Sequence, residues 1–296
     1  MQELDFFCER RLRDLDAALH ARYTESVFAM DSLLASYKNV FPFFTNHTFE
    51  HSAQVIHYCN IIAGETIINA LNADELYILL MGAALHDVGM GVSETDFRIF
   101  ARNIPPLLAE TEKNSGQSVE ELIRRFHHEL SAEFIRKYHD LFEIPSDRHT
   151  YSIAQVARGH REYDTLDVEE FPPAYPLENG RTVNLSLITA LVKLADGLDI
   201  TSDRNLFFDY SIQNENWSPH QTLCYKCHNA IKKLTAEEDR LILSFDASDD
   251  EVFAEVMRLK GKVDRRFEQY NEVLSLRTNF PPRIREILFR PLASKV

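Results

Sequence analysis

Side chains able to bind metal recur in five short segments of the first 200 residues. They are His47 and His51 in 45–52, His86 and Asp87 in 83–89, His127 and His128 in 125–131, His160 in 157–162, and Asp196 in 193–199. A lone histidine is more often a packed or solvated residue than a ligand. An ordered set of histidines and aspartates, each in or beside a predicted helix, indicates instead a metal site that several helices build together.

The adjacent pair His86 and Asp87 is the most specific signal in this set. It follows the run 76–85, which is apolar nearly all round and which a capping box at Asn72–Glu75 opens. Two polar donors at the end of a buried helix would cost several kcal/mol without partners, and a cation removes that penalty. We therefore expect His86 and Asp87 to lie at a catalytic centre.

The motifs resemble those of the HD superfamily of metal-dependent phosphohydrolases, whose pattern is H, then HD, then D on the helices of an α-helical domain. The resemblance covers about residues 40 to 205. The additional histidines make the chain similar to the longer H-HD-H-H-D version, which holds two metals. The resemblance implies six ligands, namely His51, His86, Asp87, His127, His160 and Asp196.

One subfamily, the HD-GYP-type phosphodiesterases, is a distant likeness. His127 precedes Ser131 by four residues as the corresponding ligand there precedes a small residue, and His160–Glu162 resembles the HHE element. Arg161 replaces the second histidine of HHE, and no GYP tripeptide follows, so the resemblance implies neither a third metal nor specificity for cyclic-di-GMP. His128 stays an alternative to His127, because spacing alone allows a shift of one residue.

Four histidines and two aspartates form a mixed nitrogen and oxygen ligand set. Such a set suits a divalent transition metal (Mn, Fe, Co, Ni or Zn) better than Mg, which prefers oxygen alone. Asp87 is the natural bridging carboxylate between two metals. Two metals would lower the pKa of a shared water and place it for attack on phosphorus. We expect hydrolysis of a phosphate ester or anhydride.

The balance of acidic and basic residues restricts the class of substrate. The chain has 32 Lys and Arg against 46 Asp and Glu, a formal net charge of −14, which opposes binding to long nucleic acids because they need many basic contacts. We expect a small phosphorylated substrate, with a nucleotide as the first choice. The candidate substrate-binding residues are Arg124, Arg158, Arg161, Lys193 and His47. Arg124 and Lys193 each precede a ligand by three residues and share its helix face, although ordinary exposed charges are an equal alternative.

Two other functions fit the same motifs. A di-iron HD-type oxygenase would use the same H-HD-H-H-D ligands. A signalling or partner-binding module would keep a structural or nucleotide-sensing HD site and contact another protein through its C-terminal part. The segment Cys224–His228 spells the CxxCH motif of haem attachment, but that chemistry belongs to exported chains, and no export signal accompanies it here.

These motifs require helices to hold them in place. Apolar residues at three- and four-residue spacing predict helices over 10–39, 49–70, 118–140, 151–162, 184–200 and 251–270, besides the buried run, and strands are predicted over 206–212 and 240–245. The expected fold is mainly α, with an HD-domain helical bundle over 1–204 and a small mixed α/β appendage over 205–296.

Bulk composition agrees with a globular protein. The 296 residues are 45% hydrophobic and 11% aromatic, enough for a substantial core. The N-terminus mixes acids and bases where a leader would be apolar, and no apolar run approaches ~18 residues. Four cysteines are too few for a disulfide framework in a chain of this length. We expect a cytoplasmic protein with reduced thiols and no membrane contact.

Overall fold

A computed structural model describes residues 6–35, 49–113, 117–202, 217–247 and 249–292. The N-terminal two thirds contain α1 (Phe7–Leu15), α2 (Ala17–Ala35), α4 (Phe49–Ala70), α5 (Ala73–Leu85), η1 (Val88–Gly91), α6 (Glu94–Phe100), η2 (Ala101–Asn103), α7 (Pro105–Glu112), α8 (Val119–Tyr138), η3 (His139–Phe142), α9 (Asp147–Gly159), the short strands β1 (Tyr175–Pro176) and β2 (Thr182–Val183), and α10 (Leu185–Leu198). The C-terminal part contains α12 (Pro219–Ala230), β3 (Ile231–Glu237), β4 (Arg240–Phe245), α13 (Asp250–Arg277) and β5 (Glu286–Pro291). The prediction of a mainly α fold with a small α/β C-terminal part is confirmed.

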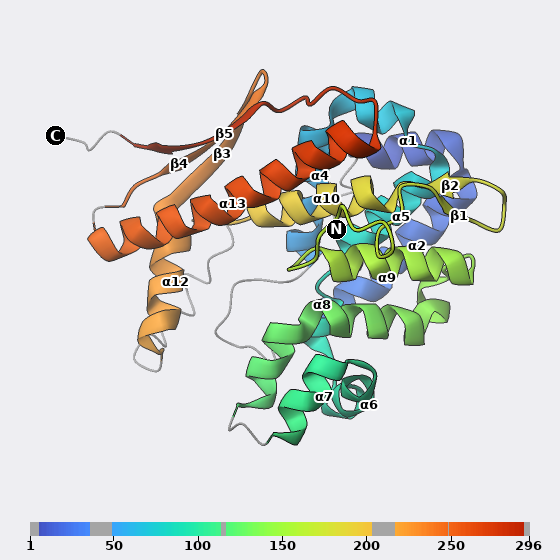
Figure 1. Ribbon diagram of the computed structural model, residues 1–296, viewed down its shortest axis with the longest axis horizontal. Helices are drawn as coiled ribbons and strands as arrows, with labels where there is room; N and C mark the ends of the chain where they lie inside the picture. The colour runs from blue at the N-terminus through green and yellow to red at the C-terminus, as the bar shows by residue number, and fades with distance from the viewer. Residues whose placement is uncertain (1–5, 36–48, 114–116, 203–216, 248, 293–296) are drawn as a thin grey trace.

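Helix α5 forms the centre of the bundle. Asn72 accepts a hydrogen bond from the backbone N–H of Glu75, and the Glu75 side chain accepts one from the N–H of Asn72, so the predicted capping box is present. Every residue of α5 except Glu75 is buried, because α1, α2, α4, α9 and α10 pack around it (Figure 1). The motif pair that follows α5 is therefore delivered to the interior of the bundle.

The first predicted helix, over 10–39, is two helices. Asp16 adopts an extended conformation that ends α1. Its carboxylate then accepts hydrogen bonds from the N–H groups of Ala18 and Leu19, which caps the start of α2. The single helix was wrong because apolar periodicity continues across a residue whose side chain competes for backbone hydrogen bonds. Residues 36–39 of the prediction lie outside the described residues.

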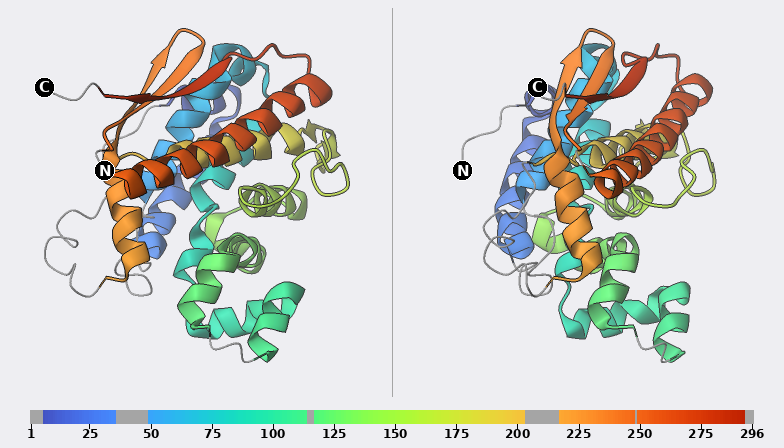
Figure 2. Two further views of the ribbon diagram at one scale, coloured as in Figure 1. Left: turned by 60° about the vertical axis from the view of Figure 1, so that its left-hand side comes forward. Right: turned by 90° about the vertical axis from the view of Figure 1, so that its left-hand side faces the viewer.

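The C-terminal part combines a three-stranded sheet with two helices. The strand order is β3-β4-β5, with β3 antiparallel and β5 parallel to β4. The strand predicted over 240–245 is β4, whereas the one predicted over 206–212 lies outside the described residues. Helix α13 packs along α10 and also contacts α12 (Figures 1 and 2). Its buried residues Tyr270, Val273 and Leu274 join the same hydrophobic core as the bundle.

The predicted boundary between residues 204 and 205 stays a prediction, because it falls in a segment outside the described residues. Within the described helices, no single one is long and apolar enough to cross a membrane. Among the described helices, the segments Ala73–Gly91 and Glu94–Asn103 together are long and apolar enough, but they are bent by 108° relative to each other.

Candidate metal centre

Five segments deliver the six predicted ligands to one buried region. His51 stands in the first turn of α4, His86 and Asp87 follow the last residue of α5, His127 lies within α8, His160 follows α9, and Asp196 lies in the last turn of α10. His51, His86, Asp87, His127 and His160 are all buried. His86 and His160 each follow the last residue of a helix, and both side chains are buried. Polar groups therefore converge inside an otherwise apolar bundle.

The first group joins His51, His86, Asp87 and Asp196. The Nε2 atoms of His51 and His86 are 3.1 Å apart. Asp87 Oδ2 lies 3.5 Å from His51 Nε2 and 3.4 Å from His86 Nε2. Asp196 Oδ1 lies 3.5 and 3.7 Å from the same two nitrogens. The donor atoms of His51, His86 and Asp87 therefore all lie within 4.8 Å of one another, and Asp196 lies beside the two histidines.

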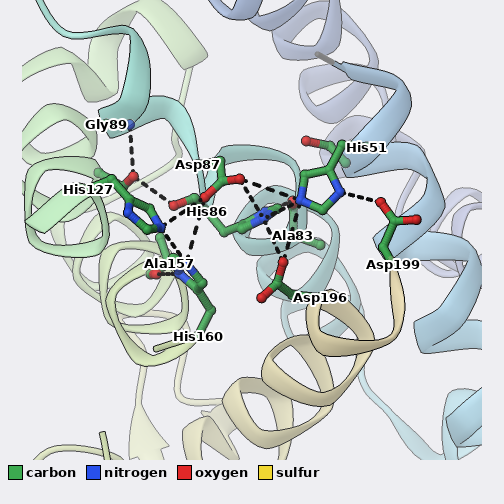
Figure 3. Close-up of polar contacts among 12 residues, drawn as sticks. His51, Ala83, His86, Asp87, Gly89, His127, Ala157, His160, Asp196 and Asp199 are labelled. Carbon is green, nitrogen blue, oxygen red and sulfur yellow. Dashed lines mark hydrogen bonds and ion pairs between the residues drawn. The ribbon is translucent and has the colours of Figure 1, made fainter. Parts of the chain in front are cut away.

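The second group joins His127, His160 and the same aspartate. Their Nε2 atoms are 3.1 Å apart, and Asp87 Oδ1 lies 3.3 Å from His127 Nε2 and 3.7 Å from His160 Nε2. Figure 3 shows Asp87 between the two groups, with His127 and His160 on one side and His51 on the other. One carboxylate thus presents one oxygen to each group. The geometry places His127, and not its alternative His128, beside Asp87.

Hydrogen bonds to the other ring nitrogen determine the state of each histidine. The Nδ1 atoms of His86, His127 and His160 contact the carbonyl oxygens of Ala83, Arg124 and Ala157, three residues earlier in each case. A carbonyl only accepts, so each Nδ1 carries a proton and the Nε2 atom of each ring is left to bind a metal ion or a second proton. In both groups two such nitrogens face each other at 3.1 Å. Facing lone pairs repel unless a cation or proton lies between them.

The donor spacing fits a metal ion in each group. A transition metal 2.0–2.2 Å from each ligand would leave neighbouring donors about 2.8 to 3.6 Å apart, and the distances here run from 3.1 to 3.7 Å. Nitrogen and oxygen donors in this mixture suit Mn, Fe, Co, Ni or Zn. The residues present therefore fit divalent metal binding, for which His51, His86 and Asp87 form one candidate group, with Asp196 beside it, and Asp87, His127 and His160 form another.

The electrostatics of the first group also favour positive charge. Burial lowers the pKa of His86, but the carboxylates of Asp87 and Asp196 outweigh it and raise that pKa to about 10. Burial raises the pKa of Asp196, yet its contacts with His51 and His86 bring it well below the usual range. For His160, burial and then the neighbouring His86 and His127 lower the pKa well below its usual value. His160 is thus held as the neutral imidazole that metals bind.

Gly89 and Ser131 fix the Asp87 turn against α8. The Ser131 hydroxyl donates to the carbonyl of His86 at 2.7 Å and accepts from the N–H of Gly89 at 2.8 Å. A Cβ on Gly89 would lie 2.3 Å from the carbonyl oxygen of His127. The turn therefore needs glycine for close backbone approach, and the small residue four positions after His127 has a structural reason.

Sequence reasoning missed Asp199. This buried residue follows α10, and its Oδ2 lies 2.5 Å from His51 Nδ1. The carboxylate accepts the Nδ1 proton, which directs the Nε2 lone pair of His51 toward Asp87 and Asp196. The segment 193–199 contains both aspartates, but sequence spacing alone does not show that the second one reaches a histidine 148 positions earlier.

Replacing Asp199 should weaken metal binding without removing a ligand. We expect Asp199→Ala to lower affinity for one metal ion about ten- to a hundredfold, because the His51 ring loses the partner that fixes its tautomer and orientation. Asp199→Asn keeps an acceptor oxygen, so its metal affinity should lie between those of Asp199→Ala and the wild type. Calorimetric titration with Mn²⁺ measures both. Equal affinity in all three proteins would show that Asp199 does not orient His51.

Beside the metal centre lies a pocket of about 260 Å³ whose lining includes Asp87, His127, His160 and Asp196. Of the predicted substrate-binding residues, Arg124 and Arg161 also line it. Among the described residues three further basic groups line it that the sequence did not indicate, namely His228 on α12 and Lys262 and Arg266 on α13. The C-terminal part therefore supplies one wall of the pocket.

Two predicted substrate-binding cations, Lys193 and Arg158, are not among the residues that line this pocket. The ammonium group of Lys193 donates to the carbonyl of Tyr163 at 2.6 Å. Arg158 contacts Glu170 and the hydroxyl of Tyr163, and its guanidinium lies 4.2 Å from the centre of the Tyr163 ring. Helix spacing for Lys193 and the position of Arg158 beside His160 did not indicate the side-chain directions, which these partners on the 163–170 segment determine. His47, the fifth candidate, lies outside the described residues.

Comparison with known proteins agrees with this geometry. The search among curated proteins gave no match. The family model named HD-CE, an HD-type domain, matches residues 41–266, which is most of the chain and includes every residue of the two ligand groups. The match ends at Arg266 in α13, so it also covers the wall that the C-terminal part adds to the pocket. The chain belongs to the HD-CE family.

Proposed function

We propose that this protein is a two-metal hydrolase that cleaves a phosphate ester or anhydride bond in a small phosphorylated molecule, with nucleotides as the first class to test. One observation carries the proposal. Two pairs of histidine Nε2 atoms face each other at 3.1 Å, and Asp87 presents one oxygen to each pair. Such an arrangement is stabilised by a cation in each position.

Bound metals at these positions would lower the pKa of a water molecule toward neutrality and offset charge that develops on phosphorus. The chain's own residues then provide the positioning. Asp87 would contribute one carboxylate oxygen to each metal position. The Arg124 and Arg161 side chains line the adjoining pocket, where guanidinium groups bind phosphate oxygens in paired hydrogen bonds. Arg266 donates to Asp196 Oδ2 at 3.0 Å and to the carbonyl of Lys193 at 2.9 Å. These bonds hold the Asp196 carboxylate in place while its other oxygen, Oδ1, faces His51 and His86.

A di-iron oxygenase would use the same ligand types, and a partner-binding module could keep the site without turnover. The basic residues beside the metal centre support hydrolysis, because a phosphorylated substrate needs them. Hydrolysis needs no oxygen, so turnover should be the same under anaerobic and aerobic conditions. A contact between the C-terminal part and another protein stays a prediction, as does the weak binding of long nucleic acids.

Metal analysis followed by a substrate screen tests the proposal. We expect protein purified without chelators to bind close to two equivalents of Mn²⁺ or Fe²⁺, because two ligand groups share Asp87. Hydrolysis of nucleotides and p-nitrophenyl phosphate should be lost after metal removal and restored by these ions. Inductively coupled plasma mass spectrometry measures the metal content, and phosphate release measures hydrolysis. Saturation at one metal per chain, or product formation that requires oxygen, would refute the two-metal hydrolase.

A further inference from the structure

The pocket beside the metal centre gathers more positive charge than the overall composition suggests. Among the described residues, Arg124, Arg161, Lys262 and Arg266 line it, against the two carboxylates Asp87 and Asp196. The whole chain has the opposite balance, with 46 acidic and 32 basic residues. Excess positive charge at one place in an acidic protein indicates a local anion.

The basic side chains that line the pocket differ in their interaction partners. Arg266 is bound to Asp196 and to the backbone of α10. Arg161 and Lys262, by contrast, have no carboxylate within ion-pair distance in the part of the chain that the structure describes. Acids are not scarce nearby, since Lys260 contacts Asp264 at 2.6 Å on the same helix. The two unpaired cations both face the pocket.

These two cations line the same pocket, and the charge of Arg161 acts on Lys262. Partial burial and then the charges of Arg258, Arg161 and Arg266 lower the pKa of Lys262. Arg161 follows the ligand His160 directly, and Lys262 lies about one helical turn, or 5–6 Å, before Arg266 on α13. Like charges held together without a counter-ion are destabilising, and an anion between them would offset that cost.

We propose, on the basis of the hydrolase function above, that Arg161 and Lys262 bind a second phosphoryl group, so that the substrate is a small molecule with at least two phosphoryl groups. The reacting phosphoryl group lies at the metal centre beside Asp87. The second one lies between the loop after α9 and α13. Ile200, Leu259 and Val263 line the same pocket and contact the uncharged part of the substrate.

Binding of compounds that cannot be hydrolysed tests this site separately from turnover. The probes are methylenediphosphonate and methylphosphonate, titrated into the full-length, metal-containing protein by calorimetry. We expect the diphosphonate to bind at least about tenfold more tightly. Lys262→Met and Arg161→Ala should each remove about tenfold of that affinity, as expected for a charge-assisted hydrogen bond, while methylphosphonate binding changes less than about twofold.

Lys260→Ala is the matched control. It removes the same charge from the same helix, but Lys260 does not line the pocket and is paired with Asp264, so diphosphonate binding should stay at the wild-type value. Equal affinity for the two probes in the wild-type protein, or an equal loss in Lys260→Ala and Lys262→Met, would overturn the second phosphoryl site. The metal content of every sample is measured after titration, so loss of metal to the probe is recognised.

Kinetics then separate the site from the proposed function. The wild type should prefer a nucleoside diphosphate or triphosphate, or inorganic tripolyphosphate, over the monophosphate in kcat/KM by at least about tenfold, and Lys262→Met should remove that preference. Hydrolysis with no preference and no effect of the variant overturns the inference and leaves the hydrolase proposal intact. Diphosphonate binding that depends on Lys262 in a protein without any hydrolase activity refutes the proposed function and supports the anion site.

Discussion

Asp87→Ala should lower kcat/KM for phosphate ester hydrolysis by about three orders of magnitude or more, because one side chain serves both metal positions. Asp87 Oδ2 lies 3.4 Å from His86 Nε2, and Oδ1 lies 3.3 Å from His127 Nε2. Its removal takes one ligand from each group and the carboxylate that spaces them. Phosphate release and metal content, measured on the same preparation, test the prediction.

The fold should survive this change. Asp87 is a buried carboxylate whose removal takes away little packing, and without it the pKa of His86 falls, so this ring can become neutral. The helical circular dichroism signal should therefore stay that of the wild type. Asp264→Ala is the control, since this aspartate on α13 pairs with Lys260 and does not line the pocket; its activity should stay within about twofold. Unchanged turnover in Asp87→Ala would exclude the two-metal mechanism.

Gly89→Ala should be the most damaging single-methyl substitution near the site. The added Cβ would lie 2.3 Å from the carbonyl oxygen of His127 and 2.5 Å from the backbone nitrogen of Ser131. Both are backbone atoms of α8, so relief requires the helix or the turn to move. We expect a loss of about 2–3 kcal/mol in the free energy of unfolding, together with weaker metal binding, because Asp87 and His127 separate.

Gly261→Ala provides the comparison. That glycine lies within α13, and its added Cβ would meet only Arg265, at 3.8 Å, so alanine should raise stability by about 0.5–1 kcal/mol through lower backbone entropy in the unfolded chain. Urea unfolding at one fixed metal concentration measures both variants. If Gly89→Ala proves as stable as the wild type, the close contact between the Asp87 turn and α8 is not present in solution.

Local sequence signals predicted most of the helical elements. The helix predicted over 49–70 has the bounds of α4, although the backbone kinks at Gly64 within it, and the Asn72 capping box begins α5. Such signals succeed because apolar spacing and caps act within a few residues of one another. The same reasoning joined α1 to α2, since apolar spacing says nothing about whether Asp16 will turn its carboxylate toward the backbone.

By itself, the sequence determined which donor types are present and that they stand on or beside helices. His86 and Asp87 after a fully apolar run were enough to predict a buried polar centre, because burial without partners is costly. The family resemblance added the order of the ligands. The partner of each donor comes from a segment far away in the chain. Asp87, for example, lies beside His127 and His160.

Only the tertiary structure decided the surroundings of that centre. Asp199 reaches His51 across 148 positions, and Arg266 reaches Asp196 across 70. Lys193 has the helix spacing of a substrate contact and Arg158 lies near His160 in the sequence, yet both side chains bind partners on the 163–170 segment. Long, charged side chains have many rotamers of similar energy, so the nearest carboxylate or carbonyl in space, and not the position along a helix, determines where each one points.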